Sequence, residues 1–320
     1  MSGIFQGFQA GNIQVQKGLI LAPMDGYSSW PFRSLCRELG SGISYTEFVK
    51  AEDVLQRPHY IEKKIYFTEV ERPVFFQLYG HDPEKILEAA LTLQKAAPDA
   101  IDINLGCPNR SIAGRGAGAG LMRSPKKVAR IIKTLTGALE VPVTAKIRLG
   151  WQDCQNYLLI ARIIEEFGGS LLAVHARTKE QGHQGDPDLP ALAEIKRAAN
   201  IPVLGNGGIE RVADIMAMKT STGCDGVMIG RAANRNPWIF SELNREDIPP
   251  KQVHAVMLDH LERSLSFYGR ESGLILFRKF AASYLAPYKF SPEQRKLLLT
   301  ELDPGKFVHL LGEIFKGIRG

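Results

Sequence analysis

Residues 141–177 read VPVTAKIRLGWQDCQNYLLIARIIEEFGGSLLAVHAR, and this stretch contains the repeating unit of the fold. It begins with an apolar run at 141–150, continues with a helix-periodic segment at 156–168, and ends in a second apolar run at 170–177. Short apolar runs rich in β-branched residues are typical of buried strands, and a helix between two of them is typical of a parallel sheet. The stretch therefore predicts a strand–helix–strand unit.

The same alternation extends over most of the chain. Apolar runs recur at 19–24, 43–49, 73–80, 100–107, 141–150, 170–177, 201–208 and 223–231, and the clearest helical segments lie at 83–97, 125–139, 156–168 and 191–199. Eight strand segments in about 230 residues match a (β/α)8 barrel, whose usual size is ~250 residues. The alternative, an open doubly wound sheet, predicts a GxGxxG motif after the first strand, and LAPMDGYSSW (21–30) contains none.

The pattern changes after the last apolar run. Residues 233–250, ANRNPWIFSELNREDIPP, are rich in turn formers, and only helical periodicity follows them. We therefore predict an α/β fold, a (β/α)8 TIM barrel over 1–240, followed by a small helical domain over 250–320.

The composition is that of an ordinary globular protein, because 44% of the 320 residues are hydrophobic and 23% are charged. No apolar run approaches the ~20 residues that span a bilayer, and the N-terminus does not resemble a secretory signal. The four cysteines are far apart and form no CxxC pair, so we predict no metal site and expect a cytoplasmic protein. A net charge of +6 permits an anionic partner, and residues 245–320 hold 12 Lys and Arg against 9 Asp and Glu.

Polar or small residues stand at the carboxyl ends of nearly all the predicted strands. The active sites of (β/α)8 barrels lie at this end, and burying so many polar groups without partners would cost several kcal/mol each. The residues therefore predict a ligand site. They are Pro23, Met24, Asp25, Glu47, Gln77, Asn104, Cys107, Lys146, Arg148, His175, Arg177, Asn206, Gly207, Gly208, Gly230 and Arg231.

The last two strand ends indicate a phosphate group on the ligand. Asn206-Gly207-Gly208 and Gly230-Arg231 stand where barrels commonly bind phosphate through backbone N–H groups, and Arg231 adds positive charge. Turn glycines that only close two loops are the simpler explanation, but it fits poorly when both motifs occur at matched positions.

Three strand-end side chains could carry chemistry. Cys107 precedes a glycine-rich loop and could act as a nucleophile or a general acid. Lys146 could form a Schiff base or serve as a fixed cation beside a developing anion. His175 could donate a proton, or a hydrogen bond to a cofactor. The residues alone leave these alternatives open.

Taken together, these motifs resemble those of the tRNA-dihydrouridine synthases. The matching motifs are A-P-M-x-G (22–26), N-x-G-C-P (104–108), K-x-R-x-G (146–150), H-x-R-T-x-x-Q-G (175–182), N-G-G-I (206–209) and D-x-V-M-I-G-R (225–231). The resemblance is greatest to the bacterial B- and C-type branches and covers about 20–240. It extends weakly into the tail, where Arg278, Lys279, Phe280 and Tyr284 are similar to part of the family's RNA-binding domain.

The resemblance implies an FMN enzyme that reduces the C5=C6 bond of specific uridines in tRNA with NADPH, NADH being the alternative reductant. By position, Cys107 corresponds to the proton donor. The residues implied to contact the cofactor are Pro23, Met24, Asp25, Gln77, Lys146, His175, Asn206, Gly207, Gly208, Gly230 and Arg231. Those implied to contact the RNA substrate are Asn104, Arg148, Arg177, Arg278 and Lys279. Asp25 and Phe280 depart from the family pattern, and no membrane or obligate protein partner is expected.

Other functions remain to be distinguished. A flavin barrel acting on a free pyrimidine, of the dihydroorotate or dihydropyrimidine type, would use similar chemistry but has no need of the helical tail. A Schiff-base aldolase using Lys146 would be colourless. An RNA-binding protein built on an inactive barrel would have no need of the polar strand ends.

Overall fold

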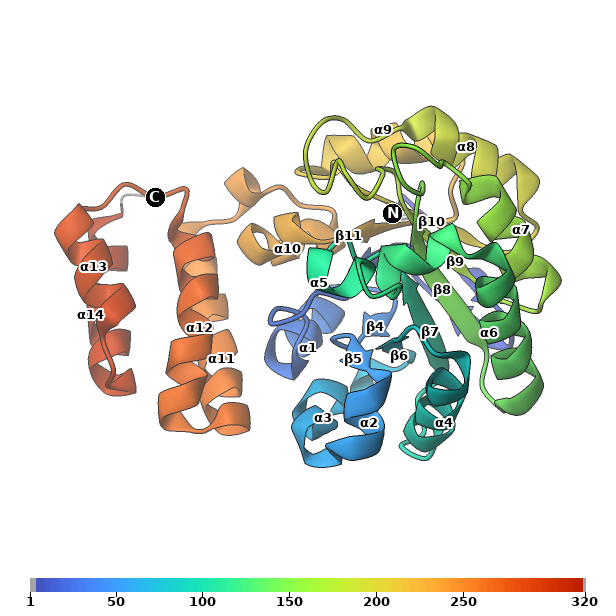
Figure 1. Cartoon of the computed structure of the whole chain (residues 1–320). Coiled ribbons are helices and arrows are strands. Elements are labelled where there is room, and N and C mark those ends of the chain that lie inside the picture. The colour runs from blue at the N-terminus through green and yellow to red at the C-terminus, as the bar shows by residue number, and fades with distance from the viewer. Residues whose placement is uncertain (1–3, 319–320) are drawn as a thin grey trace.

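The computed structural model describes residues 4–318, and most of them form a closed barrel (Figure 1). Eight parallel strands pair in chain order, and the last pairs with the first, as the predicted (β/α)8 barrel requires. The strands are β3 (Leu19–Leu21), β4 (Ser44–Tyr45), β6 (Val74–Tyr79), β7 (Ala100–Leu105), β8 (Val143–Arg148), β9 (Leu172–His175), β10 (Val203–Asn206) and β11 (Gly226–Ile229). A short strand, β5 (Val49–Lys50), extends the second position and pairs with β6.

Helices surround the barrel and connect its strands. They are α1 (Trp30–Glu38), α2 (Ala51–Gln56), α3 (Pro58–Ile65), α4 (Pro83–Gln94), α6 (Pro125–Ala138), α7 (Tyr157–Glu166), α8 (Leu189–Ala198) and α9 (Val212–Thr222). A short helix α5 (Arg110–Ala113) and a 3-10 helix η2 (Gly118–Arg123) occupy the connection after β7, and η1 (Glu69–Glu71) precedes β6. The four predicted helical segments are thus confirmed as α4, α6, α7 and α8.

The strand residues alternate between the two faces of the barrel wall. In β8, Val143, Ala145 and Ile147 belong to the core shared with the helices, whereas Thr144 and Lys146 belong to the other face. This alternation is the period of a pleated strand.

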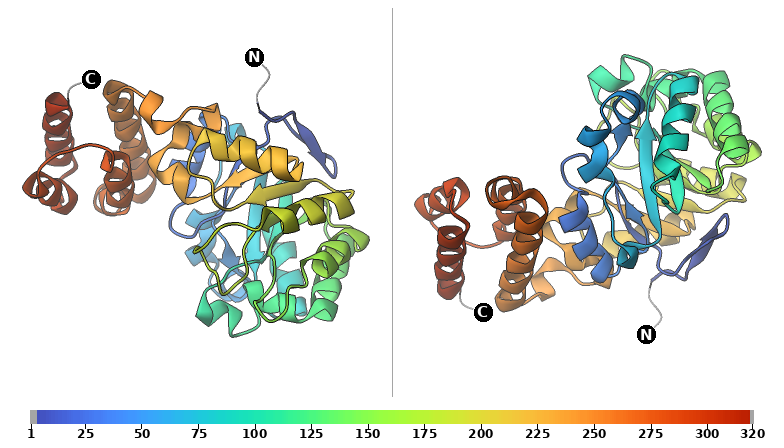
Figure 2. Two further views of the ribbon diagram at one scale, coloured as in Figure 1. Left: turned by 90° about the horizontal axis from the view of Figure 1, so that it is seen from above. Right: turned by 90° about the horizontal axis from the view of Figure 1, so that it is seen from below.

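The lower part of the barrel interior is apolar and is closed by the start of the chain. Ile20, Phe75, Leu204 and Met228 pack there, together with Ala10 and Val15 of an N-terminal hairpin. The hairpin consists of β1 (Phe8–Ala10) and β2 (Ile13–Val15) and lies at one end of the barrel (Figure 2). This hairpin was not predicted from the sequence.

The chain leaves the barrel through a short connection and ends in four helices on one side (Figures 1 and 2). The connection contains α10 (Arg231–Arg235), η3 (Pro237–Ser241) and η4 (Arg245–Asp247). The four helices are α11 (Pro250–Tyr268), α12 (Arg270–Leu285), α13 (Pro292–Thr300) and α14 (Pro304–Gly317). Among the described residues, no helix is long and apolar enough to cross a membrane.

Aromatic side chains join the tail to the barrel. The ring of Phe32 in α1 stacks on His260 of α11 with 5.4 Å between ring centroids, and lies 4.8 Å from the ring of Phe280 in α12. All three side chains are buried. The contact is therefore an apolar interface rather than a flexible linker.

Candidate active site

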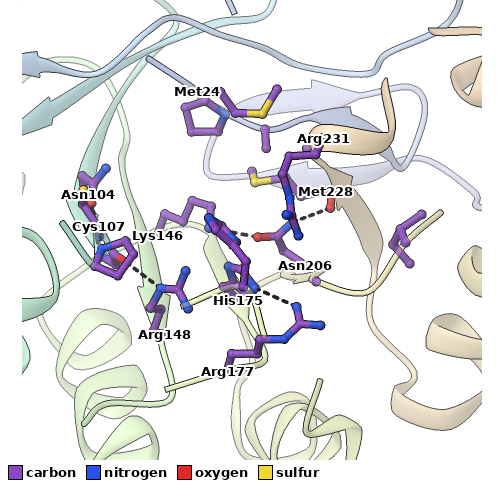
Figure 3. Close-up of a pocket in the computed structure, with 18 of the residues that line it drawn as sticks. Met24, Asn104, Cys107, Lys146, Arg148, His175, Arg177, Asn206, Met228 and Arg231 are labelled. Atoms are coloured by element: carbon purple, nitrogen blue, oxygen red, sulfur yellow. Dashed lines mark hydrogen bonds between the residues drawn. The ribbon is translucent and has the colours of Figure 1, made fainter. Parts of the chain in front are cut away.

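A cavity of about 380 Å³ opens at the carboxyl ends of the strands (Figure 3). It gathers most of the residues predicted for the site from the strand ends. They are Pro23, Met24, Gln77, Asn104, Cys107, Lys146, Arg148, His175, Arg177, Asn206, Gly207, Gly208, Gly230 and Arg231.

Lys146 lies on the inner face of β8 and points toward β10 (Figure 3). Its Nζ donates a hydrogen bond to Asn206 Oδ1 at 3.1 Å, and Asn206 Nδ2 donates to the Met228 carbonyl at 2.7 Å. Burial, helped by the nearby charge of Arg148, lowers the pKa of Lys146 to about 7. At neutral pH this amine is thus poised between its two protonation states and would become fully charged beside an anion.

His175 on β9 is a neutral hydrogen-bonding group. Arg177 Nη1 lies 3.2 Å from His175 Nε2, and a guanidinium can only donate, so Nε2 accepts and the ring proton lies on Nδ1. Burial and the surrounding cations lower the pKa of His175 far below its usual value. The ring therefore offers one N–H donor and does not serve as an acid at neutral pH.

Arg148 is held rigidly at the end of β8. Its Nε donates to the Gly106 carbonyl at 2.8 Å, and its Nη1 donates to the carbonyls of Thr178 and Gly182 at 3.0 and 2.8 Å. Burial lowers its pKa to about 10. The guanidinium ties the β7 and β9 loops together and retains unused donors on Nη2.

The cavity is electropositive. The neighbouring arginines contribute to the lowered pKa of His183, which burial and these cations bring to about 4. Such mutual repulsion is relieved by a bound anion. The cations that line the cavity are Lys146, Arg148, Arg177 and Arg231.

Two glycines bring backbone close to the cavity wall at the end of β10. Gly207 has φ +117°, and a Cβ there would lie 3.0 Å from Cδ2 of His175. Gly208 has φ +74°, and a Cβ would lie 2.8 Å from Cγ of Pro187. Both the backbone conformation and the space require glycine, as expected where backbone N–H groups approach a phosphate.

Cys107 stands at the mouth of the cavity beyond β7. Its backbone N–H donates to Asn104 Oδ1 at 2.9 Å, and Asn104 Nδ2 donates to Gln77 Oε1 at 2.9 Å. Burial raises the pKa of the Cys107 thiol. The thiol is therefore protonated at neutral pH, which suits a proton donor better than a nucleophile.

The structure places the remaining predicted residues outside this cavity. Asp25 pairs with Lys64 of α3, with 2.5 Å between Oδ1 and Nζ. Arg278 donates to the backbone carbonyl of Glu301, and Lys279 Nζ donates to the carbonyl of Gly26 and lies 4.6 Å from the centroid of the Tyr27 ring.

Glu47, the remaining strand-end residue, accepts a 2.5 Å hydrogen bond from the backbone N–H of Gly26. It lines a smaller cavity between the barrel and the helical tail rather than the main one.

Several residues of the site did not follow from the sequence, among them Phe48, His183 and Asp102. Phe48 and His183 line the cavity. Phe48 lies in the predicted apolar run at 43–49, where nothing distinguishes it from a core residue, and His183 lies one residue beyond the motif at 175–182. Asp102, buried beneath the cavity, could have been found, because it precedes Asn104 by two positions and so shares its strand face.

The fold and the site together define a (β/α)8 barrel enzyme whose strand-end cavity is built for an anionic ligand. Comparison with known proteins identifies the family, because the family model described as "Dihydrouridine synthase (Dus)" matches residues 20–309. The chain belongs to this family of oxidoreductases, as the sequence motifs predicted.

Curated relatives match over most of their length. The chain is 37% identical over 277 residues to "tRNA-dihydrouridine synthase B" of Pseudomonas aeruginosa, covering 84% of this chain and 83% of the relative. It is 38% identical over 263 residues to "Probable tRNA-dihydrouridine synthase" of Aquifex aeolicus, covering 79% and 82%. With the protein of Xanthomonas axonopodis named "tRNA-dihydrouridine synthase B", identity is 34% over 319 residues, covering 97% and 96%.

Solved structures share the fold at low identity. The 6-hydroxypseudooxynicotine amine oxidase of Pseudomonas geniculata superposes with a TM-score of 0.59 at 12% identity, covering 80% of this chain and 52% of that one. The Amycolatopsis orientalis BexX/CysO complex gives a TM-score of 0.50 at 15% identity, covering 81% and 94%. These likenesses support the fold alone.

Proposed function

We propose that this protein reduces the C5=C6 bond of specific uridines in tRNA to 5,6-dihydrouridine, using FMN and NADPH, with Cys107 as the proton donor. Membership of the family and the names of the relatives support the reaction. The observation that carries the assignment is that a protonated thiol and a buried amine, Cys107 and Lys146, line the same electropositive cavity.

The residues present fit FMN. The close-packed glycines Gly207 and Gly208, with Arg231 beside them, suit its phosphate, and Met24 offers an apolar contact for a ring. Lys146 supplies a cation whose protonation an anionic ring would favour. When bound, FMN supplies hydride to C6 of the uracil ring.

The remaining steps belong to side chains. The Cys107 thiol donates a proton to C5 and carries the resulting negative charge as thiolate, which Arg148 and Lys146 stabilise. Asn104 is placed to hold the uracil, because its side-chain N–H₂ has a second hydrogen beyond the one given to Gln77. Arg177 adds positive charge at the same rim, for the substrate backbone.

The substrate sets the remaining requirements. A uridine in folded RNA must be extruded to reach a cavity at a barrel mouth. We propose that the helical tail over 250–320 grips the tRNA while the barrel over 1–240 performs the chemistry. NADPH supplies the electrons, with NADH as the alternative, and we place the enzyme with its tRNA substrate in the cytoplasm.

The visible spectrum of the purified protein tests the cofactor assignment. We expect the protein to show flavin absorbance, which NADPH bleaches under anaerobic conditions. We also expect denaturation to release FMN that can be extracted and identified. A protein that stays colourless and binds no added FMN would refute the proposal. Turnover of free uracil or orotate by a yellow protein would instead identify a free-pyrimidine dehydrogenase.

A further inference from the structure

A buried carboxylate lies directly beneath the cavity and has no part in the chemistry described above. Asp102, on the inner face of β7, is fully buried. Its Oδ1 accepts from Thr144 Oγ1 at 2.6 Å and its Oδ2 accepts from Gln77 Nε2 at 2.7 Å. The strand register places these side chains side by side, because Gln77 and Thr144 are its direct partners on β6 and β8. Burying a carboxylate in a barrel core is costly, so its presence there calls for a reason.

Hydrogen bonds lead from this carboxylate to Cys107. Gln77 donates to Asp102, Asn104 donates to Gln77 Oε1 at 2.9 Å, and Asn104 Oδ1 is left as the acceptor. That oxygen accepts from the backbone N–H groups of Gly106 and Cys107 at 3.1 and 2.9 Å. We refer to the side chains of Asp102, Gln77 and Asn104 as the amide relay.

The direction of every bond in the amide relay is fixed by its ends. An ionised carboxylate only accepts, so Gln77 must turn its N–H₂ toward Asp102 and its Oε1 toward Asn104. Asn104 must then turn its N–H₂ toward Gln77 and its Oδ1 toward the Cys107 amide. A backbone N–H only donates, so both ends demand the same arrangement.

We propose that Asp102 is a positioning residue, which sets the orientation of the Gln77 and Asn104 amides and thereby holds the backbone at Cys107. The consequence for the reaction rests on the function proposed above. Each amide N–H₂ uses one hydrogen in the relay and keeps one for a ligand in the cavity. The relay therefore presents donors, rather than acceptors, to the carbonyl oxygens of flavin and uracil.

Asp102→Asn tests the relay without changing the shape of the side chain. Asparagine can turn either a donor or an acceptor toward Gln77, so the direction is no longer imposed. We expect amide hydrogen exchange over 105–109 to accelerate roughly 10-fold, the scale set by the loss of one buried hydrogen bond. Ile103→Val is the matched control, because Ile103 is buried in the core on the outer face of the same strand and its apolar side chain makes no hydrogen bond.

Swapping the side chains of Asp102 and Asn104 should restore the relay. In Asn104→Asp alone, two carboxylates compete for the single N–H₂ of Gln77, so amide hydrogen exchange over 105–109 should again accelerate. In Asp102→Asn/Asn104→Asp, the asparagine donates to Gln77 Oε1, Gln77 donates to the new carboxylate, and that carboxylate still accepts from Cys107. Protection over 105–109 should therefore return in the double variant, measured on the full-length protein as purified.

The outcomes separate this inference from the proposed function. Unchanged exchange in Asp102→Asn, or purely additive effects in the double variant, would overturn the positioning role and leave the flavin assignment standing. Loss of protection and its rescue would support the relay even in a protein that binds no FMN, because the measurement involves no turnover.

If Asp102→Asn does not fold, the unmodified protein carries the test through pH. Burial raises the pKa of Asp102 to about 6, and the titratable groups that face it are Lys146 on β8 and Tyr45 on β4. Protonated Asp102 can donate, so exchange at Cys107 relative to Ile103 should rise as the pH falls below about 6. Lys146, whose pKa is about 7, is already charged over this range and offers no acceptor. A constant ratio would contradict the inference.

Discussion

Cys107 is the residue on which the proposed proton donation to uridine depends. Its raised thiol pKa and its place at the cavity mouth suit proton donation to a substrate, whereas neither property bears on electron delivery to a flavin. Removing it should therefore affect only one half of the catalytic cycle.

We predict that Cys107→Ala retains FMN and is reduced by NADPH at nearly the normal rate. Reduction of uridine in tRNA should fall by roughly 10²–10⁴, the usual scale for removal of a general acid. Stopped-flow measurements separate the two half-reactions. An equal loss in both would show that Cys107 has another role.

Lys146 should couple FMN binding to proton uptake rather than to proton release. Because burial and Arg148 lower its pKa to about 7, the amine is largely neutral at pH 8. An anionic cofactor would raise that pKa, so FMN binding near pH 8 should take up protons. Calorimetry in two buffers of different ionisation enthalpy measures this uptake.

Lys146→Met should abolish the proton uptake and weaken FMN retention, or make the bound flavin harder to reduce. A Lys146→Met protein with normal flavin content, reduction potential and proton uptake would remove Lys146 from the cofactor site.

At the scale of elements, the β7 loop is shaped by two glycines that form a matched pair. Gly118 has φ +53°, and a Cβ there would lie 3.0 Å from both Cβ and O of Cys107. Gly116 has φ +76°, but a Cβ there would meet nothing within 4 Å. A side chain at either position would be strained by the positive φ, and only at 118 would it also press on Cys107.

We predict that Gly116→Ala loses about 1 kcal/mol of stability from the positive φ, and that Gly118→Ala loses more, because its Cβ also presses on Cys107. Only Gly118→Ala should slow reoxidation of the reduced enzyme by tRNA. Equal rates in the two variants would mean that the loop adjusts without moving Cys107.

Helix α12 bears the two basic residues predicted from the sequence to contact RNA. Arg278 donates to the Glu301 carbonyl at a part-buried position within the tail, whereas Lys279 donates to the Gly26 carbonyl at an exposed position beside the barrel, where RNA can reach it. We predict that Arg278→Gln lowers the melting temperature with little change in tRNA affinity. Lys279→Gln should weaken tRNA binding and reduce its log–log salt slope by close to one unit, by analogy with duplex DNA.

Filter binding over a range of salt concentrations, with melting curves alongside, checks both variants. Unaltered affinity and slope in a folded Lys279→Gln protein would remove Lys279 from the RNA site. A reduced log–log salt slope in Arg278→Gln would show that Arg278 does contact the RNA.

The elements differ in how well the sequence predicted them, for physical reasons. The barrel strands were found because they are apolar runs between turns, and α4 was found because its residues have helical periodicity and Pro83 begins it. The hairpin strands Phe8–Ala10 and Ile13–Val15 have three residues each, too few to show a period. Helix α9 was missed because apolar residues lie on its exposed face as well, Met216 among them, so the buried stripe of Ile215, Met218 and Thr222 stands out little.

The site was predicted in the same uneven way. Strand-end residues such as Lys146 and His175 follow from the barrel rule, because every parallel strand ends at one rim. Which side chains face one another does not follow from order along the chain. The pairing of Lys146 with Asn206, and the engagement of Lys279 by Gly26, depend on tertiary packing between distant segments.

At the scale of the whole molecule, the tail is fixed to the barrel around His260. This side chain is fully buried against Phe32 and Phe280, with Nδ1 3.1 Å from the Tyr284 hydroxyl. Burial, with smaller effects from Arg263 and Lys279, lowers its pKa to about 3. The folded protein therefore holds this ring neutral, whereas the unfolded chain protonates it near pH 6.5.

The sign of the resulting pH dependence follows from linkage. His260 costs nothing above pH ~6.5 and destabilises the fold progressively below it, by about 1.4 kcal/mol per pH unit. We predict that the unfolding free energy falls by about 2 kcal/mol more between pH 6.5 and 5 in the wild type than in His260→Gln. Urea titrations at the two pH values measure this, and parallel losses in both proteins would refute it.

The central claim, reduction of a uridine in tRNA, is tested most directly by nucleoside analysis of the product. Transfer RNA lacking dihydrouridine is incubated anaerobically with the FMN-loaded protein and NADPH, then digested and examined by mass spectrometry. We predict one or more uridines that have gained two hydrogens, with matching NADPH consumption, and none with Cys107→Ala in the same time. A flavin-loaded, NADPH-reducible protein that leaves every uridine unchanged, while reducing free uracil or orotate, would contradict it.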